Sequence, residues 1–151
     1  MAKAPVKTKY SARDFKNITW HDNFIHSIRL DAEKFALELD IDFIHDWIAG
    51  DAENYSFLIS PATLTFQNVS NLKIDIDWNG CSLEMAIETV ERTNPRKTAN
   101  GKLTEYDWVI ALNWPEGGAI SFAATGFTQQ SRKEPEVFDE QKIPARKRTA
   151  A

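Results

Sequence analysis

Three histidines and several aspartates are the residues of this chain whose types best suit chemistry. They lie in two stretches, WHDNFIH (20–26) and DIDFIHDW (40–47). Imidazole nitrogens and carboxylate oxygens are common ligands of zinc and related ions. His21, His26 and His45 with nearby aspartates would therefore suit a metal-dependent enzyme. Their spacing, however, matches neither a metalloprotease helix nor a calcium loop, and we predict no metal ligand here.

Other catalytic arrangements have weaker support in the sequence. Ser60, in LISPAT, lacks the flanking glycines of a hydrolase nucleophile elbow. PEGG (115–118) is the nearest approach to a phosphate-binding loop, but no lysine and no helical pattern follow it. We therefore predict no catalytic residue and no cofactor.

Acidic side chains form a regular pattern in LELDIDFIHDW (37–47) and again in NLKIDIDW (71–78). Successive strand residues point to opposite faces, so the acids of each stretch share one face and the apolar residues share the other. If these strands belong to one sheet, the acidic face suits a protein with a basic surface, because complementary charge steers association. The simpler alternative is a solvated face that pairs with local Lys or Arg, such as Arg29 or Lys73. The predicted partner-binding residues are Glu38, Asp40, Asp42, Asp75 and Asp77, with Trp47 as an aromatic anchor.

Alternation of apolar and polar residues dominates the rest of the chain and indicates half-buried strands. Residues 24–30 and 35–43 are predicted to form a hairpin, and Asn79–Gly80 is a strong signal for a second. Residues 82–92 favour a strand over a helix, and 93–105 is predicted to be a long exposed loop. The expected fold is mainly β, a single-domain antiparallel β-sandwich or partly closed barrel of about seven strands with little helix.

Length and charge limit the class of protein. A chain of 151 residues with 42% hydrophobic residues suits one domain, and its single cysteine excludes an internal disulfide. Residues 1–16 contribute +4 and residues 144–151 contribute +3 to a net charge of −4, which leaves −11 for the remainder. We predict a β domain over 17–131, a basic flexible arm over 1–16, and a charged arm or disordered tail over 132–151. The acidic body argues against nucleic-acid binding by the core.

No run approaches the roughly 20 apolar residues of a membrane span, and the N-terminal residues lack the apolar stretch of a signal peptide. A cytoplasmic protein is expected.

The stretches WHDNFIHSIRL, LELDIDFIHDW, FLISPATLTFQNV and GAISFAATGFTQQSRKEP together resemble a family of small, uncharacterised bacterial proteins. That family has a His-Asp start, a strand of alternating apolar residues and aspartates that ends in Trp, and a PATL-F turn and strand. The resemblance covers about residues 20–135 and implies no catalytic residue. A looser similarity of size, compartment and charge connects the chain with immunity proteins, which bind and block bacterial toxins.

These observations favour a non-enzymatic protein-binding domain that uses an acidic sheet face, for example an immunity-type inhibitor of a basic effector. The metal-dependent enzyme described above and a β-barrel that binds a small ligand are the alternatives.

Overall fold

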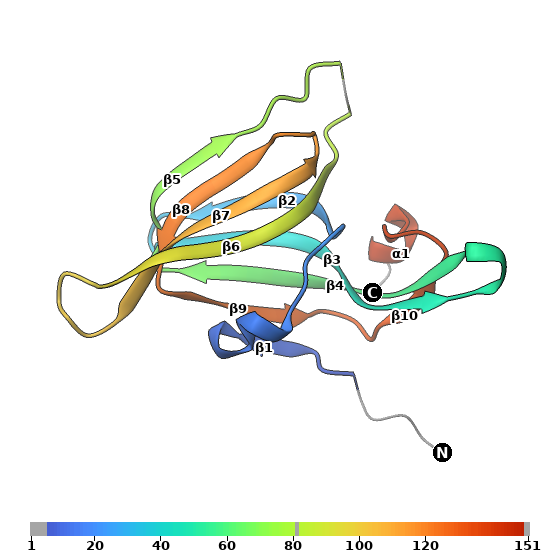
Figure 1. The fold of residues 1–151 in the computed structure, drawn as a ribbon, viewed down its shortest axis with the longest axis horizontal. Coiled ribbons are helices and arrows are strands. Elements are labelled where there is room, and N and C mark those ends of the chain that lie inside the picture. The colour runs from blue at the N-terminus through green and yellow to red at the C-terminus, as the bar shows by residue number, and fades with distance from the viewer. Residues whose placement is uncertain (1–5, 81, 150–151) are drawn as a thin grey trace.

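In a computed structural model of the protein, which describes residues 6–80 and 82–149, ten β-strands form one antiparallel sheet (Figure 1). In chain order the strands are β1 (Lys9–Ser11), β2 (Phe24–Asp31), β3 (Ala36–Ala49), β4 (Tyr55–Gln67), β5 (Ser70–Asp75), β6 (Met85–Lys97), β7 (Thr104–Trp114), β8 (Ala119–Ala124), β9 (Gly126–Ser131) and β10 (Glu136–Phe138). The described helices are η1 (Ala12–Asn17) and η2 (Asp51–Glu53), both of the 3-10 type, and α1 (Ala145–Thr149). The predicted mainly β, antiparallel domain is confirmed, with ten strands instead of about seven.

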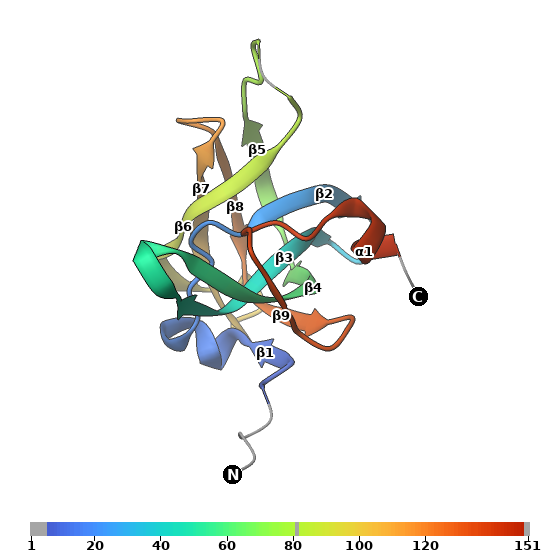
Figure 2. The same ribbon diagram turned by 90° about the vertical axis from the view of Figure 1, so that its right-hand side faces the viewer.

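The sheet follows the order β1-β9-β4-β3-β2-β6-β7-β8-β5 without closing, and β10 adds to β4. Its two halves are joined at narrow points. Strands β2 and β6 pair only at Phe24–Ala86 and Ile25–Met85, and β8 is followed by β9 after the single residue Thr125. These short joints allow the halves β1-β9-β4-β3-β2 and β6-β7-β8-β5 to run in different directions and to enclose one core between them (Figures 1 and 2).

Alternation accounts for most of this core. Leu37, Leu39 and Ile41 of β3 are fully buried and belong to the same cluster as Trp108 of β7. Phe35 begins the predicted strand over 35–43, but it lies in the β2–β3 turn with φ of 53° and is 64% exposed. A left-handed backbone turns its side chain away from the strand pattern that follows.

Two hairpin predictions need correction. Residues 82–92 do contribute to a strand, but β5 pairs with β8 and not with β6, so Asn79 and Gly80 lie in a connection between non-neighbouring strands. The predicted long loop over 93–105 is shorter, because β6 and β7 continue their pairing outward as far as Lys97 and Thr104. Arg96 supports this extension through ion pairs with Glu105 and Asp107.

Parts of both predicted arms lie on the sheet. In the N-terminal arm, of which residues 1–5 lie outside the described ranges, β1 pairs with β9. In the C-terminal segment, which we define as residues 132–149, β10 pairs with β4 and the chain continues to α1. Figure 2 shows this segment in red, passing in front of β3 and β4 and placing α1 beside β2 and β3.

Candidate functional site

The side of β3 and β4 that points away from the main core carries a group of paired acidic and basic side chains. We call it the outer face. The strand pattern places Glu38, Asp40 and Asp42 there, since they alternate with buried Leu39 and Ile41 on β3. The C-terminal segment crosses this face and supplies most of the partners of these acids.

Asp42 is a fully buried carboxylate with three partners. Its Oδ2 lies 2.7 Å from His26 Nε2 and accepts a hydrogen bond from the backbone N–H of Ile143 at 2.9 Å. Its Oδ1 accepts a hydrogen bond from Arg148 Nε at 2.7 Å. A buried carboxylate is strongly disfavoured unless it is paired and hydrogen-bonded, so Asp42 ties the C-terminal segment to β3.

Asp40 completes this site by contacting two arginines. Arg148 donates to its carboxylate from Nη1 at 3.0 Å and from Nη2 at 2.8 Å, and Arg132 donates from Nη2 at 2.5 Å. Burial alone would raise the pKa of Asp40, but the hydrogen bonds from Arg148 and Arg132 outweigh it and hold the pKa below 3.8. We call Asp40, Asp42, Arg132 and Arg148 the carboxylate–arginine cluster.

The guanidinium of Arg148 is the centre of this cluster, and its side chain is only 11% exposed. Burial lowers the pKa of Arg148, but hydrogen bonds to Asp40 and Asp42 more than compensate, and the net shift is upward. The group therefore stays charged. A planar guanidinium that bridges two carboxylates is a strong and directional form of ion pairing.

The remaining predicted acids lie in different surroundings. Glu38 accepts a hydrogen bond from Arg29 at 2.7 Å, so each of the three predicted acids of β3 contacts an arginine of the same chain. Asp75 and Asp77 are exposed on and just beyond β5, which stands at the end of the sheet with β2, β6, β7 and β8 between it and β3. The two acidic stretches therefore belong to one sheet but not to neighbouring strands.

Trp47 reaches the outer face because of a bulge at His45. The register of β3 against β4 shifts between Ile44 and Asp46, after which Trp47 lies opposite Phe57. Without the extra residue, alternation would place Trp47 on the core side. Its ring lies 5.1 Å from that of Phe57 and stacks on His21 at 6.4 Å, yet its side chain remains 38% exposed.

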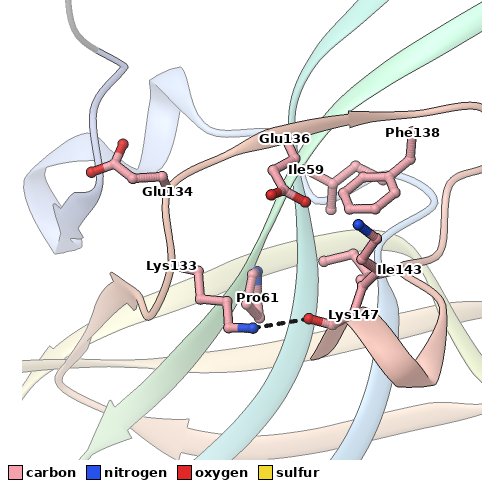
Figure 3. Close-up of a pocket in the computed structure, with 8 residues that line it drawn as sticks. All are labelled: Ile59, Pro61, Lys133, Glu134, Glu136, Phe138, Ile143 and Lys147. Carbon is pink, nitrogen blue, oxygen red and sulfur yellow. Dashed lines mark hydrogen bonds between the residues drawn. The ribbon is translucent and has the colours of Figure 1, made fainter. Parts of the chain in front are cut away.

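A second, smaller apolar cluster lies between Trp47 and the carboxylate–arginine cluster. Ile44, Phe57 and Ile59 of the sheet are buried beneath Ile143, with Phe138 packed against them. Between β4 and the C-terminal segment there is a pocket of about 360 Å³ (Figure 3). Its lining residues are Ile59, Pro61, Lys133, Glu134, Glu136, Phe138, Ile143 and Lys147.

Sequence reasoning did not identify Arg132, Ile143 and Arg148 as partners of the acidic residues. They lie in a stretch interrupted by prolines that reads as a tail, and no local pattern links it to β3. One sequence feature could have identified them. Phe138, Ile143 and Arg148 follow one another at intervals of five residues, so this stretch carries two apolar side chains and a cation that could contact the domain.

Each of the three histidines contacts a different group. His26 pairs with Asp42, His21 Nδ1 lies 3.1 Å from the backbone oxygen of Glu88, and His45 Nε2 lies 2.7 Å from Ser60 Oγ. In the described ranges, no group of three or more His, Cys, Asp or Glu side chains is placed to hold a metal ion. Ser60 is itself fully buried and contacts Ser131 Oγ at 2.9 Å, so it lies away from solvent.

His45 should make the stability depend on pH. Burial lowers its pKa from 6.5 to about 4, so below pH 6.5 the unfolded chain takes up a proton that the folded chain does not. Stability should therefore fall as the pH drops from 6.5 to 4. We expect His45→Gln to reduce the loss between pH 7 and pH 5 by on the order of 1 kcal/mol, after allowance for the partial exposure of the ring.

Urea unfolding at the two pH values measures this effect. Asn79→Gln, a substitution at an exposed residue that does not ionise, serves as the control and should leave the pH dependence close to that of the wild type. If His45→Gln and the wild type lose the same stability between pH 7 and pH 5, His45 is not the cause of the pH dependence.

Comparison with known proteins does not extend this picture: no protein family, no curated protein and no solved structure matches the chain. None of the described helices has the length and apolar character needed to cross a membrane.

Proposed function

We propose that this chain is a non-enzymatic, cytoplasmic protein-binding domain that recognises a partner with a basic surface through the outer face of β3 and β4. The observation that carries the proposal is Trp47, a large aromatic side chain held in place beside an acidic surface while 38% of it stays exposed. Inhibition of a basic effector, in the manner of an immunity protein, fits this kind of recognition.

Trp47 has the properties of an interface anchor. Tryptophan is enriched among the few residues that dominate binding energy. The rings of Phe57, Tyr55 and His21 surround the indole at centroid distances of 5.1 to 6.4 Å. A side chain already restrained by such contacts loses little conformational entropy on binding. The β3–β4 hairpin also extends beyond the neighbouring strands (Figure 1), which leaves its end accessible to another protein.

Acidic residues around Trp47 define the charge of the expected partner. Asp46 and Asp51 are exposed on the same hairpin, and Asp22 lies 3.5 Å from His21, the residue stacked on Trp47. Carboxylates at the rim of an interface contribute mainly to the association rate and to the choice of partner. A basic surface therefore complements this end of the β3–β4 hairpin.

Substitution of Trp47 tests the proposal. With the immobilised full chain as bait, proteins retained from the native cell lysate are identified, purified and titrated against wild type and variants. We expect Trp47→Ala to weaken the affinity by about 30-fold or more, in line with a loss of at least ~2 kcal/mol at a dominant interface residue. Higher ionic strength should slow the association of the wild type.

Trp114→Ala is the matched control, because Trp114 is 42% exposed and lies on β7 in the other half of the sheet. It should leave the affinity within about threefold of the wild type. If Trp47→Ala and Trp114→Ala bind the partner equally well, Trp47 is not the anchor and the proposal fails.

A further inference from the structure

We infer that the outer face is a receptor site for an arginine-bearing extended segment of another protein, and that the C-terminal segment occupies this site within the same chain. The inference rests on the proposed function and names the feature of the partner that the face recognises. The chain's own segment serves as the template for that feature.

The C-terminal segment makes three kinds of contact with the outer face, and these define the features of a segment that the face can bind. Strand β10 pairs with β4 through Glu136, Val137 and Phe138. Phe138 and Ile143 cover the apolar cluster of Ile44, Phe57 and Ile59. Arg148 then reaches the carboxylates. A matching segment would add a short strand to the sheet and present an apolar residue, a second apolar residue five positions later, and an arginine after five more.

The carboxylate pair favours arginine over lysine. Arg148 uses three nitrogens at once: Nε contacts Asp42, while Nη1 and Nη2 contact the two oxygens of Asp40. An ammonium group is a point donor and cannot reproduce this planar arrangement. The backbone oxygen of Ile41 accepts a further, longer bond from Nη2 at 3.3 Å. The site therefore selects a guanidinium by shape as well as by charge.

The C-terminal segment covers the face incompletely, as a replaceable occupant would. A pocket of about 360 Å³ lies between the segment and Ile59 and Pro61 of β4 (Figure 3), and Lys133 Nζ donates a hydrogen bond to the backbone oxygen of Lys147 on the same segment at 2.9 Å. Val137 is 57% exposed although it belongs to β10. Ile143 and Arg148 are buried contacts of this segment, so their substitution should allow it to open at a lower free energy than the core does.

The chain's own C-terminal segment competes with any free peptide for the outer face. A tethered segment acts at an effective concentration on the order of millimolar, so a free peptide of the same sequence should bind the wild-type chain poorly. Substitution of Arg148 and Ile143 in the chain's own segment should reduce that competition. Asp40, Asp42 and the sheet residues of the apolar cluster remain unchanged.

The probe is a fluorescent peptide of residues 132–149, RKEPEVFDEQKIPARKRT, titrated by fluorescence anisotropy. The hosts are full-length chains that carry Arg148→Ala alone or together with Ile143→Ser, so that a folding failure of the double variant leaves the single variant to decide. We expect each folded host to bind the peptide at least tenfold more tightly than the wild type does. A peptide with Arg148→Lys should lose at least tenfold, whereas Arg146→Lys, at an exposed position, should change little.

Equal binding by the hosts and the wild type, or indifference to Arg148→Lys in the peptide, would overturn the inference. A wild-type dimer that the peptide dissociates would assign the face to a second copy of this chain and would also overturn it. Failure of the proposed function is a separate result: a partner whose binding ignores Trp47→Ala refutes the anchor, while the peptide titration, which uses no partner, is unaffected.

Discussion

Replacing Asp42 with alanine should lower the free energy of unfolding by about 3–5 kcal/mol, the usual cost of breaking a buried ion pair by removing one partner. The carboxylate is fully buried and receives hydrogen bonds from Arg148 and from the backbone of Ile143, with His26 also in contact. Without it, these donors lose their acceptor and the guanidinium loses half of its counter-charge.

Urea denaturation at pH 7 measures this loss, and Asp75→Ala is the control. Asp75 is exposed on β5, so its replacement should change stability by no more than about 0.5 kcal/mol. A double-mutant cycle with Arg148→Ala should show that the two losses are far from additive, because both remove the same interaction. A loss below about 1 kcal/mol for Asp42→Ala, or full additivity in the cycle, would contradict the role assigned to this pair.

Replacing Trp108 with alanine should also cost about 3–5 kcal/mol, through the cavity left in the main core. The indole is fully buried, and its Nε1 donates to the backbone oxygen of Ala124 at 3.0 Å. Its ring contacts Phe66 and Phe127 from the opposing half of the sheet at 5.2 and 6.0 Å. The substitution therefore removes contacts that hold the two halves together.

Trp114→Ala on the same strand provides the comparison. That side chain is 42% exposed, and we expect its loss to cost less than half as much as the loss of Trp108. Chemical denaturation curves with unchanged slopes would attribute both differences to stability. Equal midpoints for the two variants would contradict the central position of Trp108 in the core.

The prediction of β3 was largely successful because a half-buried strand repeats every two residues. Leu37, Leu39 and Ile41 are buried where alternation placed them, and Asp40 and Asp42 lie on the other face. The pattern ended at His45, where the bulge inserts one extra residue. The alternating pattern does not reveal the register shift. The position of Trp47 on the outer face therefore could not be predicted from alternation.

The charge of the outer face illustrates the same limit. Alternation and composition identified the acidic residues of one strand face and the basic residues near both ends of the chain. They did not predict that the acids of β3 contact arginines of the C-terminal segment. Asp75 and Asp77 have the same local pattern as Asp40 and Asp42, yet they lie at the far end of the sheet with no arginine of the C-terminal segment among their contacts in the described ranges. Strand order decides this difference, and local sequence does not contain it.

The amino-acid sequence determined most strands outside the two predicted arms, most of their buried sides and the mainly β class, because these depend on periodicities within a few residues. Only the tertiary structure decided that Arg148 lies against Asp42, 106 positions earlier in the chain, and that Ile143 and Phe138 cover the outer face. Contacts at such separations follow from strand order, from the bulge at His45 and from the path of the segment after β9. The chemistry of this face therefore arises from packing between segments whose individual patterns predict only a strand and a charged tail.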